Sequence, residues 1–235
     1  MNQPKAPSLL ALAGEIRSAA ELVRLLAATP KLRAQGRGDG QPVAVLPGLG
    51  AGDGSTYLLR GYLTYLGYES HGWALGRNQG GFDELVPKVV SRVRKIYERS
   101  GRPVNIVGWS LVGILGREVA RDHPCMVRQI VTLGSPIVGG SKYTSLARLY
   151  ESRGADLDAM EVIIDQLERK PITVPITSIY SKRDGVVGWQ ASIDRWNKHA
   201  DHIEVHATHL GLGLSPEVFE IIARKLSKPG PKRQG

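Results

Sequence analysis

Short runs of apolar residues, bounded by glycine, proline or charged residues, recur through most of the chain. Runs of this length that are rich in valine and isoleucine are typical of buried strands. Because several are apolar at consecutive positions rather than alternating ones, both faces of the sheet are expected to be covered. The predicted strands lie at 42–47, 68–73, 103–107, 127–133, 174–180 and 202–206.

Longer segments separate these runs and carry apolar residues three or four positions apart, which is the spacing of one helix face. Strands that alternate with such helices predict an α/β fold, with a mostly parallel sheet of about six strands and helices on both faces. In such a sheet, reactive groups gather where loops leave the carboxyl ends of the strands. The predicted helices cover 56–66, 82–100, 114–121 and a segment that begins at 216, after Ser215.

The N-terminal region, residues 1–41, departs from this alternation. Leu12, Ile16, Val23 and Leu26 recur at helical spacing, with charged residues between them. They predict one amphipathic helix over 8–28 whose apolar face packs on the flank of the main domain.

We place the main domain at 42–226, with an insertion at 137–170 inside it and a tail at 227–235 after it. Residues 137–170 contain helical pieces near 143–152 and 156–168, and they predict a short helical lid or cap insertion. Residues 227–235 are rich in lysine, arginine, proline and glycine, and they predict a basic flexible tail.

Composition narrows the classes of function. The chain has 235 residues, a net charge of +9 and one cysteine, which excludes an internal disulfide and a cysteine zinc cluster. The basic residues are not interleaved with aromatic ones, so we expect no nucleic-acid partner. The glycine-rich loop 48–54 fits no phosphate-binding spacing, and we expect neither a metal nor an organic cofactor.

Hydropathy bears on location. No apolar run reaches the roughly 18 residues that a transmembrane helix needs. The N-terminus is a poor signal peptide because Glu15 and Arg17 interrupt its apolar run. We therefore expect a cytoplasmic protein without a transmembrane segment, and we leave open peripheral membrane contact and the oligomeric state.

Ser110 is the candidate nucleophile. It lies in Gly108-Trp109-Ser110-Leu111, between the strand at 103–107 and the following helix. A serine at a sharp strand-to-helix turn is lifted clear of the sheet edge, as in a nucleophile elbow. Such a hydroxyl needs a base to take its proton and a carboxylate to orient that base.

Asp184 and His209 each follow a later strand, and they supply the carboxylate and the base that this chemistry needs. The chain order Ser, Asp, His is that of the α/β-hydrolase arrangement. Other polar residues have simpler interpretations: Asp53 caps a helix, Asp194 lies on the surface, and Ser135 lines the cleft. His206 lies in the last strand, where its ring points into a packed face.

The chain resembles the lipases and esterases of the α/β-hydrolase superfamily over roughly residues 42–226, and in particular small bacterial proteins related to GPI-inositol-deacylase-like lipases. The resemblance implies that Ser110 is the nucleophile, His209 the general base and Asp184 the orienting acid. It also implies an oxyanion hole formed by the backbone N–H groups of Leu49 and Leu111. The stretches that carry it are Val45-Leu46-Pro47-Gly48-Leu49, Gly108-Trp109-Ser110-Leu111, Val131-Thr132-Leu133-Gly134-Ser135-Pro136, the run from Ser178 to Val187, and His206-Ala207-Thr208-His209-Leu210-Gly211-Leu212.

The resemblance implies a carboxylic ester hydrolase that works through an acyl-enzyme. Apolar residues of the 137–170 insertion, such as Leu146 and Met160, favour a lipid-like or medium-chain acyl substrate. The family usually has glycine two residues after the nucleophile, where this chain has Val112 followed by Gly113. Two alternatives stay open: a catalytically impaired binding or scaffold protein, and an acyltransferase that uses the same triad.

Overall fold

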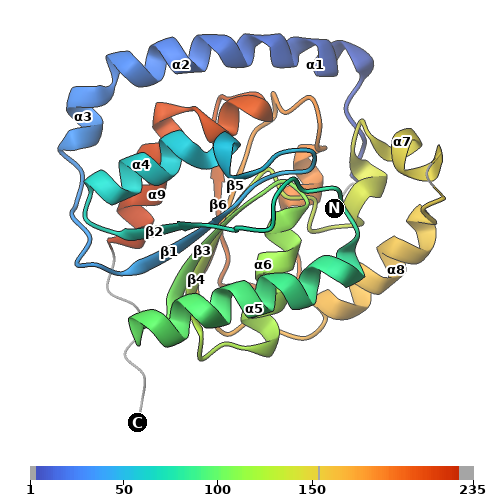
Figure 1. The fold of residues 1–235 in the computed structure, drawn as a ribbon. Helices are drawn as coiled ribbons and strands as arrows, with labels where there is room; N and C mark the ends of the chain where they lie inside the picture. The colour runs from blue at the N-terminus through green and yellow to red at the C-terminus, as the bar shows by residue number, and fades with distance from the viewer. Residues whose placement is uncertain (1–3, 153, 228–235) are drawn as a thin grey trace.

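A six-stranded parallel sheet forms the centre of the computed structural model, which describes residues 4–152 and 154–227. The strand order is β2-β1-β3-β4-β5-β6, and each neighbouring pair is parallel. The predicted α/β architecture is therefore confirmed (Figure 1). The strands are β1 (Pro42–Leu46), β2 (Glu69–Gly72), β3 (Val104–Trp109), β4 (Val127–Leu133), β5 (Ile176–Tyr180) and β6 (Asp201–Glu204).

Helices cover both faces of the sheet because alternate strand residues point to opposite sides. In β1, Val43 belongs to one core cluster and Ala44 to the other. Helices α4 (Tyr57–Tyr65) and α9 (Pro216–Leu226) lie over the first face (Figure 1). Helices α5 (Phe82–Ser100) and α6 (Val112–Asp122) lie over the second. All four correspond to helices that the sequence predicted.

The strand order positions the candidate site. β1 pairs with β2 on one side and with β3 on the other, so the order of the strands reverses at β1. Crevices at such a switch point, beyond the carboxyl ends of the strands, are where α/β sheets bind ligands. Leu49 follows β1 and Ser110 follows β3, so both lie at this reversal.

The N-terminal segment differs from the prediction of a single helix. It consists of α1 (Leu9–Ala13), a 3-10 turn (Gly14–Arg17), α2 (Ser18–Ala27) and α3 (Thr29–Arg33). It crosses the molecule outside α4 and α9 (Figure 1). The predicted apolar face points the wrong way, because Ile16 is 84% exposed and Val23 and Leu26 are each 68% exposed.

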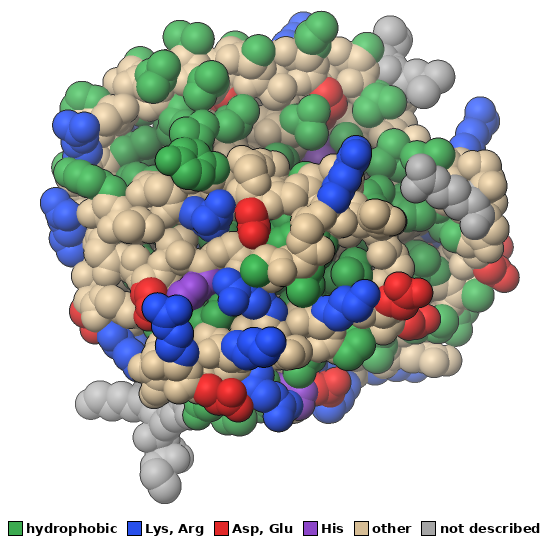
Figure 2. Space-filling model, in the orientation of Figure 1, with side chains coloured by type: hydrophobic (Ala, Val, Ile, Leu, Met, Phe, Trp, Pro, Cys, Tyr) green, Lys and Arg blue, Asp and Glu red, His purple; other side chains and the backbone are tan. Residues whose placement is uncertain are grey.

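Acidic residues of this segment face inward instead. Glu15 and Glu21 are buried, together with Leu25. Figure 2 shows hydrophobic side chains along the upper edge of the molecule, where the segment runs. The expected basic tail begins at residue 227 and otherwise lies outside the described residues.

The 137–170 insertion contains the two expected helical pieces, α7 (Ala147–Ser152) and α8 (Leu157–Glu168). Ile164 on α8 is buried in a third apolar cluster with Ile114 and Ile137, and Leu111 packs against that cluster. Val162, on another side of α8, is exposed. The insertion is thus attached to the core beside the residue that follows Ser110.

A buried ion network also holds α8 in place. Arg117 on α6 donates to both carboxylate oxygens of Glu168, at 2.7 and 2.6 Å, and to Asp194 at 2.8 Å. Burial raises the pKa of Asp194, but the charge and hydrogen bond of Arg117 and backbone N–H groups outweigh burial and leave that pKa below its ordinary value. The expectation that Asp194 is a surface residue is therefore wrong.

Candidate active site

Ser110 lies on a strained turn between β3 and α6. Its φ is +59°, a left-handed value that residues with a side chain rarely adopt. Its N–H donates to the carbonyl of Leu133 at 2.8 Å, which ties the turn to the end of β4. The side chain is half-buried. This geometry is that of a nucleophile elbow.

The elbow needs helix α6 to pass close to β3, and glycines at two positions permit this. A Cβ added to Gly108 would lie 2.6 Å from the Cα of Gly113. A Cβ on Gly113 would lie 2.0 Å from Oγ of Ser135. Val112, by contrast, is buried within the second core cluster. The close approach therefore falls at Gly113, and Val112 contributes to the core.

Asp184 and His209 form a buried pair at the ends of neighbouring strands. Nδ1 of His209 lies 2.7 Å from Oδ2 of Asp184. The other oxygen, Oδ1, accepts hydrogen bonds from the N–H groups of Val186 at 2.8 Å and Val187 at 2.7 Å. Three hydrogen bonds therefore fix the carboxylate and orient it toward the imidazole.

The surroundings of His209 favour its protonated form. Burial lowers the pKa of His209, but the charge of Asp184, its hydrogen bond and the charge of Glu15 outweigh burial and raise the pKa above its ordinary value. A base with a raised pKa holds a proton more tightly once it has accepted it. The pair is thus suited to stabilise an imidazolium.

Gly134 brings the pair close to Ser110. It follows β4 with a φ of +53°, and a Cβ there would lie 2.8 Å from Oδ2 of Asp184 and 3.0 Å from Nδ1 of His209. The preceding residue, Leu133, is the one that accepts the N–H of Ser110. Within the described residues Ser110 and His209 are not hydrogen-bonded to each other. Such bonds often tighten only when substrate binds.

The loop that carries Leu49 lies beside Ser110, and Leu111 follows Ser110 directly in the chain. A Cβ on Gly48 would lie 3.5 Å from Cβ of Ser110, which places the loop after β1 beside the elbow. Among the hydrogen bonds of the described residues, neither of the two N–H groups is a donor. Both groups can therefore donate to another acceptor.

The sequence gives no signal for Asn78, which holds the loop after β1. Asn78 is buried, and its side chain donates to the carbonyl of Pro47 at 3.3 Å. Its backbone carbonyl accepts the N–H of Gly50, and its N–H donates to the carbonyl of Ala51. Asn78 thus fixes both sides of Leu49.

Glu15 is a second residue that the sequence did not indicate. Its Oε1 accepts from the N–H of Gly185 at 2.8 Å and from that of His209 at 2.9 Å. Its Oε2 accepts from the N–H of Leu210 at 2.8 Å. The N-terminal segment is therefore bonded to the loops that carry Asp184 and His209.

Three minor predictions are corrected. His206 lies beyond β6 and is exposed, so its ring does not point into a packed face. Asp53 caps no helix; its carboxylate accepts the N–H groups of Trp73 at 2.9 Å and Ala74 at 3.1 Å. Ser135 is fully buried beneath the elbow rather than exposed in a cleft.

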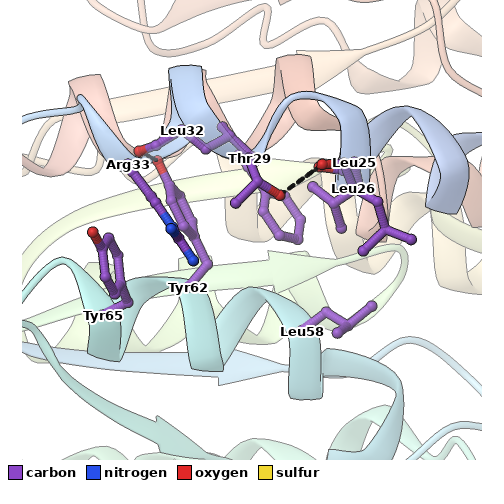
Figure 3. A pocket seen from close by; sticks show the side chains of 9 residues that line it. Leu25, Leu26, Thr29, Leu32, Arg33, Leu58, Tyr62 and Tyr65 are labelled. Atoms are coloured by element: carbon purple, nitrogen blue, oxygen red, sulfur yellow. Dashed lines mark hydrogen bonds between the residues drawn. The ribbon is translucent and has the colours of Figure 1, made fainter.

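An apolar pocket of about 240 Å³ lies elsewhere, between the N-terminal segment and α4 (Figure 3). Its lining includes none of Ser110, Asp184 and His209. The lining residues are Leu25, Leu26, Thr29, Leu32, Arg33, Leu58, Tyr62, Tyr65 and Phe219.

Within residues 4–152 and 154–227, no His, Cys, Asp and Glu side chains cluster in a way that could hold a metal. None of the helices there is long and apolar enough to cross a membrane.

Solved structures resemble the chain over most of its length. A Bacillus licheniformis lipase matches with a TM-score of 0.65 and 15% identity, covering 82% of this chain and 94% of the lipase. A metagenome-derived lipolytic enzyme matches with a TM-score of 0.62 and 16% identity, over 82% of this chain and 94% of the enzyme. A Paleococcus ferrophilus monoacylglycerol lipase matches with a TM-score of 0.56 and 18% identity, over 80% of this chain and 94% of the lipase.

These matches define the class of the protein by its fold. The chain has the α/β-hydrolase fold, and its structural neighbours include lipases and esterases. No family model and no curated protein sequence matches it. The relation to GPI-inositol-deacylase-like lipases stays a prediction, because identities of 15% to 18% reveal the fold alone.

Proposed function

We propose that the protein is a serine hydrolase that cleaves carboxylic esters through an acyl-enzyme. The observation that carries this proposal is the buried 2.7 Å pair of His209 and Asp184, set at the same sheet edge as the strained Ser110. A serine nucleophile, a base and an orienting carboxylate at successive strand ends form the constellation that acyl transfer needs.

In the proposed reaction, Oγ of Ser110 bonds to the ester carbonyl carbon while its proton passes to Nε2 of His209. Nε2 is the free ring nitrogen because Nδ1 faces Asp184. The carbonyl oxygen becomes an oxyanion that accepts hydrogen bonds from the N–H groups of Leu49 and Leu111, each worth about 3 kcal/mol by analogy with proteases.

Collapse of this intermediate breaks the bond to the alcohol oxygen, which leaves with the proton from His209. Water then attacks the acyl-enzyme and gives a proton to His209. The second intermediate releases the carboxylic acid as His209 returns this proton to Oγ of Ser110. His209 must be neutral to accept a proton, so we expect kcat/KM to rise with pH through the raised pKa of His209.

A lipid-like or medium-chain acyl group is the proposed substrate class. The supporting observations are apolar side chains beside the site: Leu210, next to His209, is 49% exposed, and Ile16 adjoins the Glu15 that binds this loop. The 137–170 insertion, attached beside Leu111, is the proposed lid.

Peripheral contact with an anionic lipid surface is part of the same proposal. Val23 and Leu26 on α2 are exposed together with Ile16, and the exposed basic residues Arg17 and Arg24 lie on the same segment. An exposed apolar stripe can insert into such a surface, and the basic residues beside it are attracted to the anionic headgroups. The cytoplasmic location stays a prediction.

Acyl transfer would use the same acyl-enzyme, with an alcohol or amine in place of water, and product analysis separates it from hydrolysis. The impaired-scaffold alternative rested on Val112. It loses support because the close approach that the family meets with glycine falls here at Gly113, and Val112 packs in the core.

A fluorophosphonate probe tests the proposal. We expect it to label the folded wild type and not Ser110→Ala, while Ser55→Ala, at an exposed serine, labels like the wild type. His209→Ala is expected to abolish turnover of p-nitrophenyl octanoate, and His206→Ala, at an exposed histidine, is expected to preserve it. If a folded wild type is neither labelled nor active, the proposal that the protein is a serine hydrolase is refuted. A strong preference for acetyl over octanoyl esters would refute the lipid-like substrate.

A further inference from the structure

Glu15 is a buried carboxylate that the proposed reaction does not use. It lies in the 3-10 turn Gly14–Arg17, and it is 6% exposed. Burying a charge is costly unless hydrogen bonds replace its hydration. Here three backbone N–H groups do so, from Gly185, His209 and Leu210. None of these partners belongs to the N-terminal segment itself.

The hydrogen bonds of Glu15 join the same two loops that the contact between Asp184 and His209 connects. One oxygen of Glu15 accepts from Gly185, the residue after Asp184, and from His209 itself. The same carboxylate therefore fixes the backbone on both sides of the 2.7 Å contact between Asp184 and His209. Glu15 is far from both in sequence, 170 positions from Gly185 and 194 from His209.

The local backbone fits this contact closely. A Cβ on Gly185 would lie 2.2 Å from the carbonyl oxygen of Ala11, and one on Gly188 would lie 2.1 Å from that of Lys5. The segment before Glu15 thus lies directly on the Asp184 loop. The helix also breaks at the 3-10 turn that carries Glu15, between α1 and α2.

We propose that Glu15 is a positioning residue, which clamps the Asp184 loop to the His209 loop and makes the N-terminal segment part of the active site. This inference rests on the proposed function. Glu15 touches no reacting atom; it acts by holding His209 and Asp184 at the spacing and orientation that proton transfer requires.

Glu15 also acts on His209 through its charge. The ionised groups that act on the imidazole are Asp184, from the loop after β5, and Glu15, from the N-terminal segment. Trp109, which is uncharged, lies with its ring centroid 6.3 Å from that of His209. Both carboxylates favour the imidazolium, so loss of either charge lowers the pKa of His209.

The segment has anchors that do not depend on Glu15. Leu25 and Leu32 are buried in the first core cluster. The hydroxyl of Tyr62 donates to the carbonyl of Leu32 at 3.1 Å, and Lys31 pairs with Glu220 at 2.7 Å. Substitution of Glu15 is therefore expected to loosen the two loops while α2 and α3 stay docked.

The variants Glu15→Gln and Glu15→Ala test the clamp in the full chain, with Glu21→Gln as the matched control. Glu21 is a buried carboxylate of the same segment, but its hydrogen bond goes to Arg24 and not to either loop. We expect kcat for a soluble ester to fall about 10- to 100-fold in both Glu15 variants, with KM changed less than about threefold. Glu21→Gln is expected to match the wild type.

Two readouts separate positioning from a general loss of structure. The acid limb of the pH–rate profile is expected to move to lower pH in Glu15→Gln, because the charge that raises the pKa of His209 is gone. Nitrogen-15 NMR of the histidine rings, assigned with His209→Ala, is expected to report the same downward shift without any turnover. Circular dichroism and thermal melting establish that each variant is folded.

The outcomes distinguish this inference from the proposed function. A folded wild type without ester turnover refutes the proposed function, and the NMR titration still decides the clamp. An active wild type whose Glu15→Gln variant has unchanged kcat and an unchanged His209 titration overturns the clamp and leaves the hydrolase intact. Loss of activity in Glu15→Gln without any shift of the His209 titration or of the acid limb also overturns it, because it marks a purely structural role.

Discussion

The sheet and the N-terminal segment bury opposite kinds of side chain. In the sheet, Val43, Val107 and Val131 are fully buried and fill the space under α4 and α9. In the N-terminal segment, Glu15 and Glu21 are buried while Ile16, Val23 and Leu26 face outward. Helical spacing of apolar and polar residues predicted the opposite face of the N-terminal segment, so the periodicity alone does not determine which face is buried.

The difference follows from what each region packs against. The strands meet apolar helix faces, and there the hydrophobic effect decides the orientation. The turn around Glu15 instead meets the loops after β5 and β6, whose N–H groups need an acceptor. One carboxylate meets three such donors, and leaving them unpaired would cost about 1–3 kcal/mol each. The apolar stripe then faces solvent.

Arg117→Ala is expected to have the largest effect on stability. It removes the arginine that pairs with the buried carboxylates of Glu168 and Asp194, and it leaves Glu168 with only its 2.9 Å contact to Arg121. The free energy of unfolding should fall by about 3–5 kcal/mol. Urea unfolding at neutral pH measures this. Arg169→Ala, which removes an exposed pair with Asp165 on α8, is the control and should cost under about 1 kcal/mol.

The same variant has a pH signature. The pKa of Asp194 is lowered in the folded state, so the stability from its charge is present above the ordinary aspartate pKa and is lost as pH falls through the lowered one. The difference in unfolding free energy between the wild type and Arg117→Ala should therefore become smaller at acidic pH. A gap that stays constant down to about pH 3 would contradict this account, because protonation of the carboxylates would then not matter.

A pair of leucine substitutions tests the comparison directly. Leu63→Ala, in the first core cluster, removes a fully buried side chain and should cost about 2–5 kcal/mol of unfolding free energy. Leu26→Ala, on the exposed side of α2, should change stability by less than about 0.5 kcal/mol. Equal losses of stability in the two variants would show that Leu26 is buried in solution and that the apolar side of α2 does not face solvent.

Much of the fold was predictable because local and global preferences agree there. The strand and helix segments of the domain combine β-branched runs, helical spacing and glycine turns, all pointing to the same parallel sheet. The order Ser110, Asp184, His209 at strand ends could be proposed for the same reason, and the structure brings Asp184 and His209 into contact.

Glu15 and Asn78 could not be predicted because their roles depend on distant partners. Glu15 looks like an ordinary polar residue of an amphipathic helix until the loops at Gly185 and His209 are brought to it by the fold. Asn78 lies in a loop whose sequence gives no periodicity, and its bonds to Pro47 and Gly50 appear only in three dimensions. The expectation that Val112 crowds the turn after Ser110 failed for a related reason. The closest approach of the helix to the strand lies one residue further on, at Gly113.

The smallest expected effect concerns the outward stripe itself. If it contacts an anionic lipid surface, Val23→Asp should weaken binding to vesicles of mixed phosphatidylcholine and phosphatidylglycerol about tenfold, because insertion of a valine side chain contributes about 1.5 kcal/mol. Co-sedimentation measures the partition coefficient. Val162→Asp, at an exposed valine of α8, carries the same charge change and should bind nearly as the wild type does. Equal loss in both variants would place the contact elsewhere. A wild type that ignores vesicles but forms a dimer in light scattering, which Val23→Asp dissociates, would show instead that a second copy of the chain covers the stripe.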